Sequence, residues 1–199
     1  MRFRSLRLLL LGAFIVLLAG CATGGRLVAA AEGVRVFELS FDTTMDWARY
    51  RDSRIELWTI DGLPLNEFVV VSRVRPGEHV FLEAKERKGR PDGPWFREGM
   101  RPDEIRDVLL DGLRQDGWTN VTASHLRPAR FGEVDGLRFD LQLTHSNGLV
   151  YRGMYAAAVH DGRLSHWFWV APAEHYYGRD VAAVESMFAS ARFVASAAK

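Results

Sequence analysis

The stretch GMYAAAVHDGRLSHWFW, Gly153 to Trp169, predicts a tight antiparallel hairpin. Asp161-Gly162 is a favoured dipeptide for a two-residue hairpin turn, in which both positions adopt positive φ. With these two residues at the turn, Ala156 lies opposite Trp167. A small residue opposite a large one is how neighbouring strands fill a core. The second half of the chain therefore contains a buried hairpin.

A second turn extends this hairpin into a three-stranded meander. Asn147-Gly148 is another favoured turn dipeptide, and centring it places Phe139 opposite Ala156. One sheet face then carries Phe139, Leu141, Met154, Ala156, Trp167 and Trp169. The other face is mixed and carries Asp140, Gln142, Tyr151, Tyr155, His166 and Phe168. A slip of one residue would exchange the two faces, because side chains alternate along a strand.

Helices and strands come in separate blocks around this meander. Apolar alternation or β-branched runs predict strands over 34–41, 55–60 and 68–74. Apolar stripes at helical spacing predict helices over 102–118 and 178–191. Blocks of this kind imply an α+β fold, in which helices cover an antiparallel β-sheet.

The N-terminus predicts export and attachment to a membrane. Three arginines precede the apolar run Leu8–Leu18, which is too short for a comfortable transmembrane helix of about 20 residues. The next residues, Leu18-Ala19-Gly20-Cys21, resemble the bacterial lipobox. That resemblance implies acylation of Cys21, cleavage before it, and placement on the periplasmic side of the outer membrane, since Ala22 follows instead of aspartate. A transmembrane anchor and a buried structural cysteine are the less favoured alternatives.

Removal of residues 1–20 changes the net charge of the chain and leaves a tether followed by one domain. The mature chain has 199 − 20 = 179 residues and a net charge of −2, from 26 − 3 = 23 basic and 25 acidic residues. We expect a flexible tether over 21–33 and a single domain over 34–199. No basic field remains that would favour nucleic acid. Cys21 is the only cysteine, so disulfides, thiolate metal sites and a cysteine nucleophile are excluded.

The last 75 residues or so resemble a known sandwich fold. The matching pieces are Gln115–Trp118 at a helix end, the strand around 121–126, the corner Phe131–Gly136 and a final helix closing on Ser190–Phe193. This pattern is similar to the PsbP protein of photosystem II and to a eukaryotic Ran-binding nuclear-import factor. The resemblance implies an α/β/α sandwich that serves mostly as an accessory or binding module, and it supplies no catalytic residues.

Two groups of aromatic residues are candidate contact sites. Trp95 and Phe96 lie in the polar stretch 83–101, where they either cover a core edge or form the tip of a presenting loop. Tyr151, Tyr155 and His166 lie on the mixed face of the meander. They are either ordinary core residues or a pocket wall for a sugar, peptide or amphiphile.

No catalytic or metal constellation is expected. The histidines of the second half lack the tight spacing of a zinc site. The pairs Ser165-His166 and Ser124-His125 are strand neighbours whose side chains point to opposite faces, so neither pairs a nucleophile with its base. We therefore expect a non-enzymatic envelope lipoprotein without a cofactor. It would act as an accessory or interaction module with an envelope protein partner or, alternatively, as a carrier of a small ligand.

Overall fold

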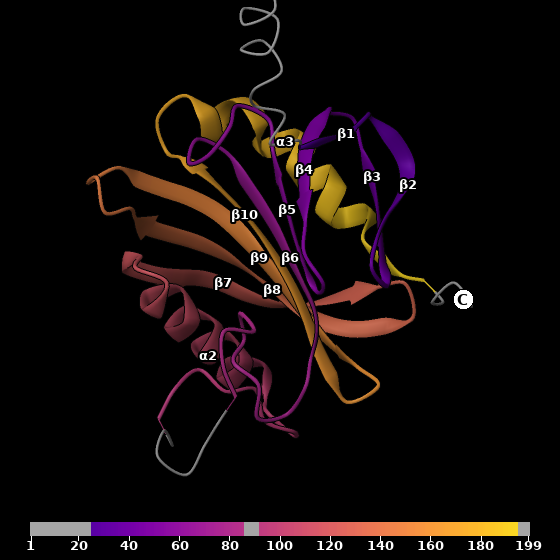
Figure 1. The fold of residues 1–199 in the computed structure, drawn as a ribbon, viewed down its shortest axis with the longest axis vertical. Coiled ribbons are helices and arrows are strands. Elements are labelled where there is room, and N and C mark those ends of the chain that lie inside the picture. The colour runs from indigo at the N-terminus through magenta and orange to yellow at the C-terminus, as the bar shows by residue number, and fades with distance from the viewer. Residues whose placement is uncertain (1–24, 86–91, 195–199) are drawn as a thin grey trace, which may run out of the picture.

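The computed structural model describes residues 25–85 and 92–194, and these form a three-layered molecule (Figure 1). Two helices are described, α2 (Pro102–Gln115) and α3 (Tyr176–Ser190). The strands of the first half are β1 (Arg26–Val28), β2 (Ala31–Val36), β3 (Leu39–Thr43), β4 (Trp47–Arg51), β5 (Ile55–Thr59) and β6 (Glu67–Val74). Those of the second half are β7 (Thr119–Phe131), β8 (Val134–Thr144), β9 (Val150–His160), β10 (Arg163–Pro172) and β11 (Arg192–Phe193).

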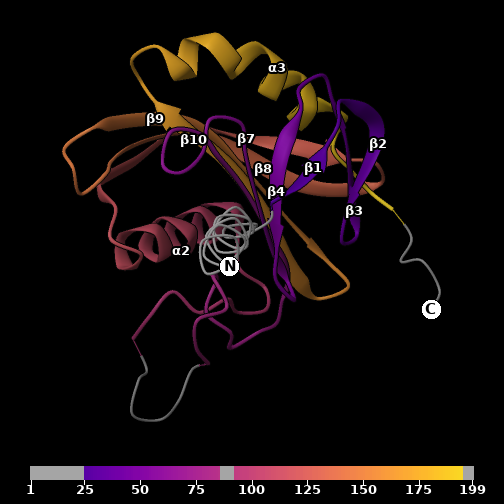
Figure 2. The same cartoon turned by 45° about the horizontal axis from the view of Figure 1, so that its top comes forward.

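The central layer is an eight-stranded antiparallel sheet in the order β1-β4-β5-β6-β10-β9-β8-β7. Helix α2 lies on one face, and α3 lies on the other together with a small sheet of β11, β3 and β2 (Figure 2). The expected α+β class, an antiparallel sheet covered by helices, is confirmed. The two helices end close to the predicted limits.

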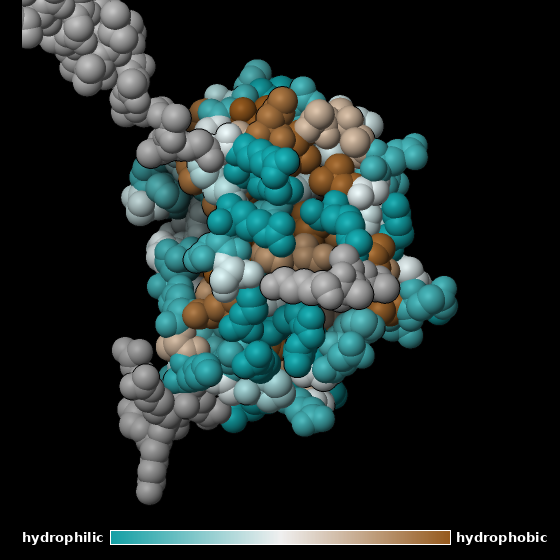
Figure 3. Space-filling view, turned by 45° about the vertical axis from the view of Figure 1, so that its right-hand side comes forward, coloured by the Kyte–Doolittle hydropathy of each residue, from teal (hydrophilic) through white to brown (hydrophobic). Residues whose placement is uncertain are grey.

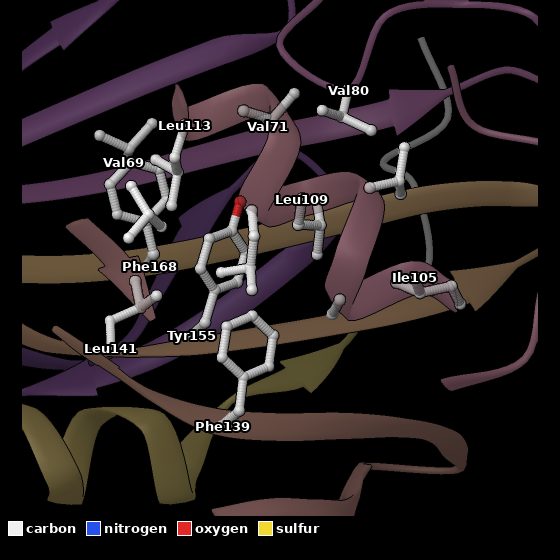
Figure 4. Packing of buried hydrophobic residues seen from close by; sticks show 14 of the residues in the cluster. Val69, Val71, Val80, Ile105, Leu109, Leu113, Phe139, Leu141, Tyr155 and Phe168 are labelled. Atoms are coloured by element: carbon white, nitrogen blue, oxygen red, sulfur yellow. The ribbon is translucent and has the colours of Figure 1, made fainter. Parts of the chain in front are cut away.

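The core under α2 is built mainly from aromatic and aliphatic side chains (Figure 4). Tyr155 is stacked between Phe139 and Phe168, with ring centroids 4.9 and 5.1 Å away. Leu109 of α2 is fully buried above this layer. Helix α2 therefore forms because its apolar stripe covers one face of the meander.

The core under α3 is rich in tryptophan and phenylalanine. Trp167 lies 4.6 Å from Phe131 and 5.9 Å from Phe41 between ring centroids. Phe188 of α3 packs on Phe68 of β6 at 6.0 Å. The sheet is thus buried on both faces, which explains why β6 and β10 are nearly continuous apolar runs.

The register of the meander is confirmed for one hairpin and corrected for the other. Ala156 pairs with Trp167 as expected. Phe139, however, pairs with Tyr155 and not with Ala156. The connection is a five-residue loop over 145–149, in which the His145 N–H donates to the Leu149 carbonyl at 2.9 Å. An odd number of loop residues shifts the pairing by one, so Phe139 and Tyr155 share the α2 face.

The first half holds more strands than expected. Residues 34–41, predicted as one strand, form a hairpin of β2 and β3, because Phe37 adopts a φ of +56° and turns the chain. Strand β1 and the start of β2 lie in the segment expected to be a tether. The folded domain therefore begins at least as early as Arg26.

Strand β7 forms an irregular outer edge of the sheet. Its pairing with β8 shifts twice, near Asn120 and near His125, and both of these residues have positive φ. Pro128 interrupts the backbone donors of the same strand. The opposite edge, β1, has only three residues.

The predicted lipobox and Cys21 lie outside the described residues. Among the residues that are described, no helix is long and apolar enough to cross a membrane.

Candidate functional site

The two aromatic residues of the predicted presenting loop are buried. Trp95 is 3% exposed and Phe96 is 1% exposed. Backbone hydrogen bonds join the Phe96 N–H to the Glu78 carbonyl and the Gly77 N–H to the Phe96 carbonyl. This pairing folds the segment inward, so the expectation of an exposed aromatic tip is corrected and the core interpretation holds.

The three candidates on the meander are buried as well. Tyr151, Tyr155 and His166 are each 0% exposed. The Tyr155 hydroxyl donates to His166 Nδ1 at 2.8 Å, because His166 Nε2 carries the proton that it donates to the Val80 carbonyl, also at 2.8 Å. Tyr151 packs edge-on against Trp118 at 5.2 Å. These residues build the α2 core and do not form an accessible pocket wall.

A hollow lies elsewhere, where turns distant in sequence meet at one end of the sheet. We call it the arginine pocket; its volume is about 460 Å³. Its polar lining residues are Glu38, Arg73, Glu133, His160, Asp161, Arg163, Ser165 and Arg192. The side of the molecule that carries β2 and β3 shows hydrophilic residues with small apolar areas between them (Figure 3).

Arg73 is held in an unusual conformation at this pocket. Its φ is +58°, a left-handed value that costs a non-glycine residue free energy. Its N–H donates to Ser165 Oγ at 2.9 Å, and its carbonyl accepts from Arg54 Nη1 at 2.9 Å. Within the described part of the chain its guanidinium has no hydrogen-bond or ion-pair partner. Arg73 also lines an adjoining hollow of about 400 Å³.

The floor of the pocket is a carboxylate held by two hydroxyls. Glu38, in the turn between β2 and β3, accepts a hydrogen bond from Ser72 Oγ at 2.6 Å and a short one from Ser165 Oγ. A β-bulge between Leu164 and His166 places Ser165 for this contact. Ser165 is 2% exposed, and its oxygen both accepts from Arg73 and donates to Glu38. It is therefore a structural hydroxyl and not a presented nucleophile.

The other arginines differ in how they are paired. Arg192 lies 3.4 Å from Asp42, whose pKa is lowered first by the Gly33 N–H and also by Arg192. Arg163 has no side-chain partner among the residues with a described position. Two guanidinium groups, those of Arg73 and Arg163, are thus available to a ligand.

The acidic residues at the rim already have partners. Glu133 lies 3.2 Å from Arg130, and Asp161 lies 3.8 Å from His160. Among the described residues, Arg73 and Arg163 are the two guanidinium groups of the pocket without an ion-pair partner, and the Glu38 carboxylate, held by two neutral hydroxyls, lines the same pocket. A guanidinium binds carboxylate or phosphate oxygens through two parallel hydrogen bonds, so the pocket suits an anionic group.

A third hollow, of about 270 Å³, lies at the end of α2, and its lining includes Glu67, Asp116 and His145. Burial raises the pKa of Glu67 to about 7; the electrostatic interaction with His145 opposes this rise, and the interaction with Asp116 adds to it. Burial also raises the pKa of Asp116. Within the described part of the chain, no hydrogen bond joins these three side chains to one another. Within 25–85 and 92–194, no three potential metal ligands converge.

Sequence reasoning missed the arginine pocket because its residues come from five separate segments. One signal was available, since Arg73 is the one charged residue in the mostly apolar stretch 68–74. Its significance depends on the left-handed backbone and on Ser165, and neither follows from local pattern.

Comparison with known proteins gives likenesses only at the level of three-dimensional structure. No protein-family model matches the chain, and no curated protein matches it. A crystal structure from Bacteroides thetaiotaomicron has 12% identity and a TM-score of 0.43, over 88% of this chain and 50% of that one. The solution structure of the cyanobacterial PsbP protein of Synechocystis has 9% identity and a TM-score of 0.42, over 84% of this chain and 99% of that one. This chain therefore spans half the length of the Bacteroides chain.

Proposed function

We propose that the protein is an envelope lipoprotein that acts as a non-enzymatic interaction module and binds an anionic group of its partner in the arginine pocket. The observation that carries the binding role is the guanidinium of Arg73. Its peptide is fixed on both sides at a strained φ, while its charge has no partner in the described structure. Backbone strain that is maintained by surrounding contacts is typical of functional positions.

The anchor is proposed from the sequence of the first 25 residues. Acylation of Cys21 would hold the domain on the periplasmic side of the outer membrane, since two or more acyl chains give stable attachment. Replacing Cys21 by serine should move the protein from the membrane fraction to the soluble fraction. If Cys21→Ser stayed with the membranes, the anchor would be wrong.

The partner is proposed to present a carboxylate or phosphate beside an apolar group. Val134 and Phe193 line the same pocket as Arg73 and Arg163, so a charged head and an apolar neighbour can be bound together. An acidic segment of an envelope protein, with one large apolar side chain, has this chemistry. The guanidinium groups would supply orientation, and the apolar wall would supply burial.

Photo-cross-linking in intact cells tests this proposal. A photoreactive amino acid in place of Val134 should capture an envelope protein, and Arg73→Gln should abolish the capture. Arg75→Gln removes the same charge two residues away, outside the pocket, and should leave the capture unchanged. Two outcomes would count against the arginine pocket. One is equal capture in Arg73→Gln and Arg75→Gln, and the other is capture that does not exceed that of a Cys21→Ser control.

A small amphiphilic anion is the second candidate ligand. A volume of about 460 Å³ falls within the range of small-molecule sites. Dodecyl phosphate should then raise the melting temperature of the purified protein, whereas dodecyl maltoside of equal chain length should not. Arg73→Gln should remove the difference between the two amphiphiles; stabilisation by both to the same extent would exclude a charge-selective site.

A further inference from the structure

An apolar part of the main sheet is left uncovered on the α2 side. Strands β1 and β4 place Leu27 and Tyr50 on this face, and these side chains are 68% and 45% exposed. Leu27 pairs with Ala48, and Tyr50 pairs with the half-buried Leu57 of β5. We call Leu27, Ala48, Tyr50 and Leu57 the β1–β4 patch.

The patch is open because the apolar core under α2 stops at β5. That core includes Ile55 and Leu57 but no residue of β1 or β4. On the opposite face the same two strands are covered, since Val28 and Trp47 belong to the core under α3. One face of β1 and β4 is therefore buried, while the other presents apolar side chains outside the described core.

The chain leaves the domain at this patch. The Cα of Gly25 lies against Tyr50, because a Cβ at that position would come within 3.0 Å of the Tyr50 ring. Only three residues separate Gly25 from Cys21. Four extended residues span at most about 14 Å, so acyl chains on Cys21 would enter the bilayer within that distance of Gly25.

The short connection to Cys21 favours a membrane over a second copy as the occupant. Acyl chains on Cys21 would hold the patch within reach of the bilayer at any protein concentration, whereas a second copy would have to be met in solution. The arginines of these strands lie on the opposite face, where Arg26 is the Cα partner of Arg49 and both Arg49 and Arg51 lie 3.4 Å from Glu56. The patch itself is therefore apolar.

We infer that the β1–β4 patch rests on the membrane surface, with Leu27 and Tyr50 in the interfacial region of the bilayer. The inference rests on the proposed acylation of Cys21, and it adds an orientation to the anchor. Exposed apolar residues beside a lipid-anchored cysteine gain burial at the interface without penetrating the hydrocarbon deeply. The sheet edge would then face the lipid, and the domain could not tumble freely above it.

Depth-dependent quenching tests the orientation. The acylated protein would carry Leu27→Cys or, independently, Tyr50→Cys, each labelled with a thiol-reactive fluorophore; Cys21 itself is blocked by its thioether. Vesicles of phosphatidylcholine and phosphatidylglycerol with brominated acyl chains should quench both labels several-fold more strongly than a label at Val159→Cys. Val159 is a matched control, because it is apolar, 40% exposed and on β9, far along the sheet from β1.

Each outcome decides the question. Strong quenching at 27 and 50 but not at 159, lost when Cys21→Ser is added, supports the membrane contact. Equal quenching at all three positions, or cross-linking of Leu27→Cys to the same residue of a second copy, overturns it. Mass spectrometry of the same sample separates the two proposals, since an unmodified Cys21 defeats the anchor and the contact together, whereas an acylated Cys21 with an unquenched label defeats the contact alone.

Discussion

His166 shows how the interior fixes the state of one titratable residue. Both ring nitrogens have partners, since Nδ1 accepts from Tyr155 and Nε2 donates to Val80. Adding a proton would place a second donor against the Tyr155 hydroxyl and leave a charge in the core. Burial accordingly lowers the pKa of His166 to about 4, although the bond to Val80 opposes the shift.

Acid should therefore destabilise the protein through His166. In the unfolded chain a histidine titrates near pH 6.5, so between about pH 6.5 and 4 the unfolded state binds the extra proton and unfolding becomes easier as pH falls. The loss is about 3 kcal/mol over this window. Urea unfolding at several pH values gives the free energy of unfolding as a function of pH. Between about pH 6.5 and 4 this free energy should change less with pH in His166→Gln than in the native chain. His160→Gln, at an exposed histidine, should keep the pH dependence of the native chain. A pH dependence that is unchanged in His166→Gln would contradict the role of His166 in acid destabilisation.

Glu67 should make the folded protein less stable as the pH rises, which is the opposite of the effect of His166. Because burial raises its pKa to about 7, the folded state retains a proton that the unfolded state releases near pH 4.5. Stability from this residue is present at pH 4.5 and is lost as the pH rises through 7. Glu67→Gln should unfold at higher urea than the native chain at pH 8, by less than about 3 kcal/mol because Glu67 keeps some contact with water, and should match it near pH 4.5. Glu98→Gln on the exposed loop serves as control; equal gains from both variants would refute a role for burial.

At the scale of the element, helix α2 was predictable in its limits but not in its tightest contact. Proline in its first turn, acidic residues at its N-terminus and a one-sided apolar stripe all appear in the sequence. Gly112 lies in that stripe, where an added Cβ would come within 2.6 Å of Val80 and 2.8 Å of Phe81. These neighbours come from the irregular segment after β6, which no local pattern places over the helix.

Two glycine-to-alanine substitutions should therefore have opposite effects. Alanine in a helix is favoured over glycine by up to about 1 kcal/mol. At Gly178 of α3, where nothing lies within 4 Å of an added Cβ, the substitution should stabilise the protein by about 0.5 kcal/mol. At Gly112 the crowding should outweigh the gain and destabilise by about 1–2 kcal/mol. Thermal denaturation of the two variants measures whether each one is stabilised or destabilised. A stabilised Gly112→Ala would show that Val80 and Phe81 can move away from the added methyl group at little cost.

In the meander, local sequence predicted the strand pairing of one hairpin but not of the other. The Asp161-Gly162 hairpin follows from its dipeptide, and its pairing was predicted correctly. The Asn147-Gly148 loop contains an equally favoured dipeptide but spans five residues, and this single difference exchanged the two faces of β8. Arg73 could not be predicted as a site residue, because its role arises from contacts with Ser165 and Arg54 that are remote in sequence.

At the scale of the whole molecule, the two cores share one sheet. Neighbouring residues of β9 serve opposite sides, since Tyr155 belongs to the core under α2 and Ala156 to the core under α3. Neither helix can lose its support without exposing the strands that back the other. We therefore expect a single cooperative unfolding transition.

Matched core truncations test this coupling. Leu109→Ala under α2 and Phe188→Ala under α3 should each cost about 3–4 kcal/mol. Hydrogen exchange should then show that either variant lowers the protection of both helices by the same amount. Loss of protection only in the helix that carries the substitution would indicate two independently unfolding units.

The irregular pairing of β7 has a consequence for the behaviour of the protein at high concentration. A long, flat strand with free backbone donors would be a template for pairing with neighbouring copies. Two bulges and Pro128 interrupt that template, and β1 is too short to provide one at the other edge. The protein can thus accumulate at high density without its sheets fusing edge to edge into aggregates.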